Sequence, residues 1–175
     1  AKLGDELLRP SDISVLVTSH REARKVEEVL QHVDVPAVRV VQESIYETEE
    51  ALELERVLAA VAQPNSPSFV RAALLTDMFG YSLRQLSEVP ENDPFWDDLS
   101  ERLHRYHERW RQSGFMQMFR ELTATENTFR RLLNLPDGER RTTNLLHLAE
   151  KIHTEFIHSR DLSRVLMWFS TTRDH

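Results

Sequence analysis

Apolar residues in the first part of the chain fall into two short runs with an amphipathic stretch between them. The run Asp12–Thr18 is short and β-branched, which predicts a buried strand. Apolar side chains recur at helical spacing over residues 21–33, and Val35–Val41 predicts a second strand with its proline at the entry. Strand, helix and strand in this order predict a βαβ unit with parallel strands, which needs further strands beside it to form a stable sheet.

From residue 47 onward the spacing of apolar residues is helical. Prolines end the first of these stretches, Gly80 ends the second, and the turn cluster Pro90–Pro94 marks the favoured position for a boundary. The pattern predicts helices over residues 47–63, 69–79, 82–89, 95–113, 115–125, 127–135, 141–158 and 161–169. We therefore expect a mainly α chain, with a small α/β part at its beginning and an all-helical body.

Charge is distributed unevenly along this pattern. The 175 residues, of which 40% are hydrophobic, can bury one core, and the net charge of -7 argues against wrapping nucleic acid over the whole surface. Residues 42–99 hold twelve acids and three bases, whereas residues 102–141 hold nine arginines and five acids. A phosphate or another acidic partner should therefore prefer the later segment.

Composition excludes several classes of protein. The chain has no cysteine, so it forms no disulfide and has no thiolate nucleophile, which fits a reducing cytoplasm. Apolar stretches such as Val57–Ala62 are too short to span a bilayer, and no charged-then-apolar leader opens the sequence. The four glycines are scattered and form no phosphate loop, so we expect no tight ATP binding.

Three groups of side chains could carry chemistry or bind nucleic-acid bases, and each has a simpler interpretation. His104 and His107 lie one turn apart, as metal ligands can, but no third and fourth ligand is visible, which favours exposed side chains on a charged helix. The adjacent acids Glu49 and Glu50 point in different directions on a helix and are explained by the helix dipole. Several aromatic residues could stack on bases, although their helical spacing favours core packing. These are Trp96, Tyr106, Trp110, Phe115 and Phe119.

The segment Thr18–Arg24 lies between the first predicted strand and the following helix. Free N–H groups and the helix dipole can hold a phosphate at such a position. Ser19 can equally be an ordinary N-cap, with Glu22 completing a capping box. Both interpretations remain open from the residues alone.

Five segments resemble a known family of DNA helicases. Asp12–Arg24 with Val35–Val38 resembles the strand and helix of the second motor domain of UvrD-type superfamily 1 helicases. Glu43–Ala51 is similar to the next motif of these helicases, and Phe69–Gly80 is similar to the segment that leads to their helical insertion domain. Two later segments narrow the family. Trp110–Leu122 and Gly138–Glu150 are similar to stretches of the RecB family, the beta subunits of exodeoxyribonuclease V. The resemblance runs from about Asp12 to Glu150 in the order of that family.

The resemblance implies a fold and a function. It implies a partial second RecA-like helicase domain over residues 1–82, followed by a helical insertion domain over residues 83–175. It also implies a part in ATP-dependent 3′-to-5′ unwinding of broken DNA ends for recombinational repair, with RecC and RecD as partner subunits. ATP and Mg would serve the longer parent protein, a helicase and nuclease of the bacterial cytoplasm, whereas this chain would be a non-catalytic internal fragment without a cofactor.

Candidate DNA contacts follow from the resemblance and from the arginine-rich segment. Thr18 and His20 replace the arginine and asparagine that the family usually has in its first motif. Tyr46 and Glu50 match the second motif, where both could serve packing alone. The candidates for contact with single strands or duplex ends are Ser19, Arg21, Arg24, Arg105 and Arg109.

Two functions from other classes fit the same residues. The acidic segment and the amphipathic helices suffice for a helical protein-interaction module without a role on nucleic acid. A metal-dependent enzyme is a more distant alternative, because only the histidine pair supports it.

Overall fold

Most of the chain is helical, as the spacing of its apolar residues predicts. The computed structural model describes residues 2–3, 6–7, 13–17, 20–33, 35, 44–157 and 161–173. The chain divides into two compact units, residues 1–43 and residues 44–175. The division predicted between residues 82 and 83 falls within the second unit and stays a prediction about domain organisation.

The first unit contains a short hairpin and one helix. Strand β1 (Lys2–Leu3) pairs in antiparallel orientation with β2 (Glu6–Leu7), and helix α1 spans His20–His32, close to the helix predicted over residues 21–33. None of the side chains described in this unit is fully buried. The unit therefore has no apolar core among its described residues.

The predicted βαβ unit, and with it the RecA-like fold class, is wrong. Residues 13–17, the described part of the first predicted strand, pair with no strand among the described residues. Their side chains are exposed, and Leu16 reaches 96%. The second predicted strand lies outside the described residues except for Val35, which is not in a strand. β-Branched residues favour extended backbone, but a strand also needs a hydrogen-bonded neighbour, and residues 13–17 have none in the part of the chain that the structure describes.

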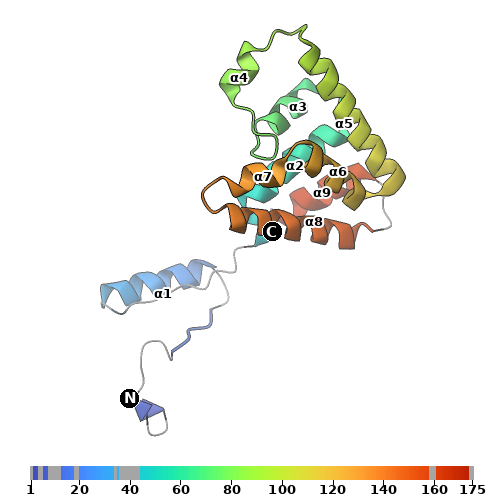
Figure 1. Ribbon diagram of the computed structural model, residues 1–175. Coiled ribbons are helices and arrows are strands. Elements are labelled where there is room, and N and C mark those ends of the chain that lie inside the picture. The colour runs from blue at the N-terminus through green and yellow to red at the C-terminus, as the bar shows by residue number, and fades with distance from the viewer. Residues whose placement is uncertain are drawn as a thin grey trace. The chain divides into compact units, whose positions relative to one another are not determined.

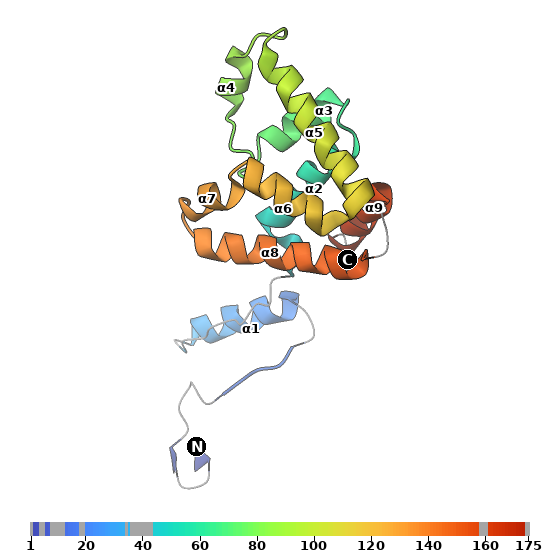
Figure 2. The ribbon, with the colours of Figure 1, turned by 45° about the vertical axis from the view of Figure 1, so that its right-hand side comes forward.

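In the second unit α2 (Glu49–Ala62) lies at the centre of the other helices (Figures 1 and 2). It contacts α3 (Pro67–Leu74), α5 (Pro94–Ser113), α8 (Gly138–Glu155) and α9 (Leu162–Arg173). The helical spacing of apolar residues from residue 47 onward gives α2 one apolar stripe, and this stripe lies in the core, since Ala51, Leu54, Leu58 and Val61 are each 1% exposed or less. The all-helical body is thus confirmed.

The remaining elements connect these helices. They are the 3-10 turn η2 (Ile45–Glu47), α4 (Leu83–Glu88), α6 (Phe115–Thr125) and α7 (Thr128–Leu133). Helix α4 has no buried residue and lies at the margin of the unit, away from α8, in both views. The main error in the helical body is the length of the helix predicted over residues 69–79, which ends at Leu74 because Thr76 bonds its hydroxyl to the Ala73 carbonyl at 2.6 Å and a turn follows.

The helix boundaries are set by the side chains that the sequence offers for capping. Thr48 accepts the N–H of Ala51 at the start of α2, and Ser82 forms a capping box with Gln85 at the start of α4. Prolines occupy the first turn of α3 and of α5, where a missing N–H costs nothing. Local polar chemistry therefore fixes where these helices begin.

Candidate functional site

Two of the predicted DNA contacts, Arg105 and Arg109, lie side by side on α5. They are separated by one helical turn, and both donate to Glu121 of α6, from Nε of Arg105 to Oε1 at 3.1 Å and from Nε of Arg109 to Oε2 at 2.6 Å. About half of each arginine side chain is exposed. Because two cations share one carboxylate, the cluster keeps an excess positive charge in a fixed geometry.

The other arginines of the basic segment differ in how far their charge is compensated. Arg102 pairs with Asp98 and lies 3.2 Å from Glu126, and Arg111 pairs with Glu108 at 3.2 Å. Further arginines of this segment are exposed and have no acidic partner within the described part of the chain. These are Arg120 and Arg130. The surplus of positive charge predicted for residues 102–141 is therefore concentrated at a few exposed positions.

The three candidates in the first unit are not brought into a site that can be described. Ser19 and Thr18 lie outside the described residues, as does the predicted phosphate position at the start of the helix. Arg21 and Arg24 belong to α1. Contact between these residues and DNA stays a prediction.

A buried ionic cluster joins three distant segments, and sequence reasoning missed it. Arg141 on α8 donates from Nε to Oε1 of Glu50 at 2.8 Å, from Nη1 to Asp77 at 2.5 Å and from Nη2 to Glu53 at 3.2 Å. The second oxygen of Glu50 accepts the amide N–H of Asn144 at 3.0 Å. Glu50 is 2% exposed and Arg141 is 7% exposed, so the cluster forms part of the core.

Glu50 does lie in the first turn of α2, as the helix-dipole interpretation requires, but its carboxylate points inward. A signal for this was present in the sequence. Glu50 stands four residues before Leu54 and therefore on the buried face of the helix, whereas Glu49 is exposed. An acid on an apolar stripe indicates a buried cation elsewhere in the chain.

Burial and charge act in opposite directions on this cluster. Burial raises the pKa of Glu53 above its ordinary value, and the neighbouring Arg141 guanidinium offsets only part of that rise. Burial alone would lower the pKa of Arg141, but its bonds to Asp77 and Glu50 raise it instead. Arg141 is thus held in its charged form. These groups serve the packing of α8 on α2, and nothing in their geometry indicates a catalytic acid and base.

The candidate aromatic residues divide into core and surface. Tyr106, Trp110, Phe115 and Phe119 are at most 3% exposed, which confirms core packing for these four. The Tyr106 hydroxyl donates to Glu126 at 2.7 Å, and burial with this bond raises its pKa. Trp96 is partly exposed and differs from the rest.

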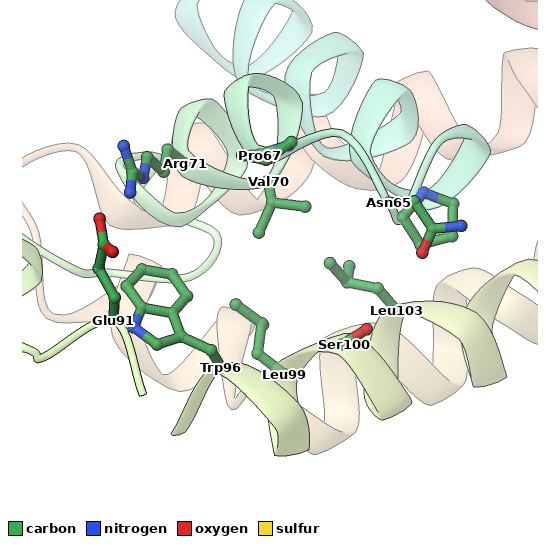
Figure 3. A pocket seen from close by; sticks show the side chains of 10 residues that line it. Asn65, Pro67, Val70, Arg71, Glu91, Trp96, Leu99, Ser100 and Leu103 are labelled. Atoms are coloured by element: carbon green, nitrogen blue, oxygen red, sulfur yellow. The ribbon is translucent and has the colours of Figure 1, made fainter. Parts of the chain in front are cut away.

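Trp96 lines a pocket between α3 and α5 (Figure 3). The pocket has a volume of about 400 Å³. Val70 projects into it from α3, and Leu99 and Leu103 project into it from α5, while Arg71 and Glu91 lie at the Trp96 end. Sequence analysis did not find this pocket, because it depends on how two helices cross.

Other kinds of site find little support in the described part of the chain. His107 bonds through Nδ1 to the Val61 carbonyl of α2 at 2.8 Å, whereas His104 bonds through Nδ1 to the Ser100 carbonyl of its own helix at 2.8 Å. No group of three or more potential metal-binding side chains occurs among the described residues. No helix in the same residues is both long and apolar enough to cross a lipid bilayer.

Comparisons with known proteins agree on one family. No family model matches the chain. It is 34% identical to the RecBCD enzyme subunit RecB of Escherichia coli over 164 residues, which are 93% of this chain and 14% of that protein. It is 27% identical to the subunits of the same name from Haemophilus influenzae and Mycolicibacterium smegmatis, over 93% and 97% of this chain. The chain spans about 14% of the length of these curated relatives, a share that fits an internal fragment. It therefore belongs to the RecB family.

Proposed function

We propose that the chain is a non-catalytic helical part of a RecB subunit of a RecBCD enzyme, acting in recombinational repair of broken DNA in the bacterial cytoplasm. The observation that carries the proposal is that all eight curated relatives, matched over 82% to 97% of this chain, have the name RecBCD enzyme subunit RecB. ATP and Mg would be bound, and DNA unwound from 3′ to 5′ and cut, by other parts of that subunit. RecC and RecD would be its protein partners.

We further propose that Arg105 and Arg109 contact the phosphate backbone of DNA. Their shared bonds to Glu121 restrict the rotamers of both side chains, so less conformational entropy is lost when a phosphate binds. One carboxylate compensates only one of the two charges, which leaves a cation for an anionic partner. Both guanidinium groups carry further N–H donors that point in fixed directions and suit phosphate oxygens.

The test is a fluorescence anisotropy titration of the chain with a labelled single strand and with a duplex that carries a single-stranded end. We expect weak binding at low salt. Replacement of both residues, Arg105→Gln with Arg109→Gln, should weaken it and lower the slope of log affinity against log salt by about 1 to 2, because each phosphate contact contributes roughly 0.7 to 0.9.

A matched control removes the same charge elsewhere. Arg56 and Arg84 are exposed residues outside the basic segment, and Arg56→Gln with Arg84→Gln makes the same change in net charge. Equal losses in the two double variants would mean that only net charge matters. Absence of binding at low salt would remove autonomous DNA binding from the proposal.

The second candidate is a helical module that contacts partner subunits and does not bind nucleic acid. The excess of acids over residues 42–99 and the pocket between α3 and α5 favour it. The two candidates separate when the labelled chain is titrated with RecC and RecD in the absence of DNA. Binding to these subunits without binding to DNA supports the second candidate.

A further inference from the structure

Residues 82–92, which include α4, are held to the rest of the second unit by few contacts. Leu86 is the only residue of α4 that is not exposed, and α4 has no extensive contact with another element of the described chain. Both ribbon views show loops that join α4 to α3 on one side and to α5 on the other (Figures 1 and 2). A helix of six residues is unstable in isolation, so the position of α4 depends on the two ends of this segment.

The hydrogen bonds of the segment are mostly local. Within the described part of the chain, the hydrogen bonds of residues 82–89 stay inside that range, as in the capping box of Ser82 with Gln85. Such bonds shape α4 but do not hold it against another helix. The end nearer to α3 is fixed just before the segment, where the N–H of Tyr81 donates to the Leu74 carbonyl at 3.1 Å.

At the end nearer to α5, one tryptophan attaches the segment. The Nε1–H of Trp96 donates to the Pro90 carbonyl at 2.9 Å, and the N–H of Asp93 donates to the same carbonyl at 3.1 Å in the turn before α5. The Trp96 ring centre lies 5.0 Å from that of Phe95 and 5.9 Å from the guanidinium carbon of Arg71 on α3. The indole is therefore placed by α3 and α5, and its N–H holds the segment to them.

The segment also supplies one end of the pocket between α3 and α5. Glu91 is the one lining residue that comes from residues 82–92, since the others belong to α3, to α5 or to the turn before α3. Figure 3 shows Glu91 beside Trp96, with Val70 and Leu99 on the two facing helices. Val70 and Leu99 are 9% and 1% exposed, so close packing in the core keeps these walls in place. A displacement of the segment would change one end of the pocket and leave the rest.

We propose that residues 82–92 form a flap that opens while the helical body stays folded, and that this opening removes the Glu91 end of the pocket and frees the Trp96 ring. A segment with few apolar contacts and mostly local hydrogen bonds opens at a lower free energy than the whole domain. Opening of the flap loses the indole bond and the partial burial of Leu86, whereas opening of α2 exposes the core. The structure shows the closed form of the pocket, and the open form has access from the side of Glu91.

Hydrogen exchange of the whole folded chain, followed by proton–nitrogen NMR, measures the opening. The reporters are the Leu86 amide in α4, the Trp96 indole N–H and, for the body, the Leu58 amide in α2. The indole signal is assigned as the one among the three tryptophans that is missing from Trp96→Phe. We expect the first two reporters to exchange at least about a hundredfold faster than Leu58, because they do not require global unfolding. Their rates should also depend little on low concentrations of urea, because a local opening exposes little surface.

Substitutions at the two ends of the flap test whether it opens as one unit. Leu86→Ala should raise the exchange rate of the Trp96 indole, although the two residues lie in different helices. Conversely, Trp96→Phe removes one hydrogen bond and should raise the rate of the Leu86 amide by about two- to tenfold. Leu83→Ala makes the same change as Leu86→Ala at a position that is 72% exposed, and should leave the indole rate unchanged. Trp168→Phe, in α9, is the control for the loss of an indole and should leave the Leu86 amide unchanged.

Three results would overturn the proposal. The first is exchange of the Trp96 indole and the Leu86 amide as slow as that of Leu58. The second is no response of the indole to Leu86→Ala together with no response of the Leu86 amide to Trp96→Phe, which would mean that α4 unwinds without opening of the flap. The third is an effect of Leu83→Ala on the indole as large as that of Leu86→Ala.

Discussion

Arg141 illustrates how a charged side chain can be accommodated in a helical core. Its guanidinium donates to Glu50, Glu53 and Asp77, and these carboxylates come from two other segments of the chain. Each ion alone would lose several kcal/mol on leaving water, so the cluster is stable only when it is complete. The loss of one member should therefore cost more than the loss of an exposed ion pair.

We predict that Arg141→Ala lowers the free energy of unfolding by about 3 to 5 kcal/mol, because Glu50 would remain buried without its cation. Urea denaturation followed by circular dichroism measures this change. The neighbouring Arg140 is 55% exposed and lies 3.8 Å from Glu50, so Arg140→Ala should change the same quantity by less than about 1 kcal/mol. Similar effects of the two substitutions would show that the cluster is not energetically coupled.

Glu53 leads to a prediction on pH. Its pKa is raised in the folded state, so between pH 4.5 and that higher value the folded chain keeps a proton that the unfolded chain has lost. Ionisation then favours unfolding, and the contribution of Glu53 to stability falls as the pH rises through this range. The free energy of unfolding of the natural chain, minus that of Glu53→Gln, should accordingly fall as the pH rises above about 4.5.

The measurement for Glu53 is a series of urea titrations at several pH values on either side of 4.5. Glu49→Gln removes an exposed carboxylate from the same helix and serves as the control for net charge. If the difference increases with pH instead, the ion pair with Arg141 outweighs burial and the direction of the pKa shift is wrong.

At the scale of elements, helix positions follow from local residues. Ser82, Asp93 and Gly114 stand at helix boundaries that the sequence indicates, and the helix predicted over residues 115–125 has these same bounds in the structure. The strand predicted over Asp12–Thr18 is not found in its described part, residues 13–17, because a strand depends on a partner elsewhere, which local propensity does not supply. The partners of Arg141 and the pocket at Trp96 could not be predicted for a similar reason, since both depend on which helices pack together.

The turn between α3 and α4 depends on one glycine and one distant arginine. Gly80 has a φ of +77°, and a Cβ at this position would collide with the side chain of Arg131. Arg131 in turn donates to the carbonyls of Met78 at 2.7 Å and Glu126 at 2.9 Å, so it cannot move without losing these bonds. The turn is thereby attached to α7.

We predict that Gly80→Ala destabilises the chain by about 1 to 3 kcal/mol, partly through backbone strain and partly through the collision. In a chain that already carries Arg131→Ala the collision should be absent and only the backbone strain should remain. Gly80→Ala should therefore lower the free energy of unfolding by less in that chain. Gly114 also has positive φ but has no atom within 4 Å of the added Cβ. Gly114→Ala should therefore show no coupling to Arg131→Ala when unfolding free energies are combined in a double-mutant cycle.

At the scale of the whole molecule, the two units differ in what stabilises them. All described residues that are fully buried lie between Thr48 and Phe169, in the second unit. In the first unit apolar side chains such as Leu16 and Val29 are 96% and 64% exposed. The free energy of folding should therefore come from the second unit.

We predict that a chain reduced to residues 44–175 unfolds cooperatively at the same temperature as the whole chain, within a few degrees. Differential scanning calorimetry and circular dichroism measure this temperature. The shorter chain should also remain monomeric to higher concentration, because it lacks the exposed apolar run of residues 13–17. A fall of more than about ten degrees would show that the first unit contributes to the stability of the second.

We infer that Arg141, the buried ion of α8, also selects one alignment of this helix among several similar ones. A helix repeats after about 5.4 Å, so a slip of α8 by one turn would leave Leu145 and Leu148 in a similar apolar environment. The same slip would leave the buried carboxylate of Glu50 without its cation, and new apolar contacts would not offset that cost. Leucines tolerate such a misalignment and the cluster of Arg141 with its carboxylates does not, so we expect these few charges, rather than the more numerous aliphatic residues, to determine which packing is adopted.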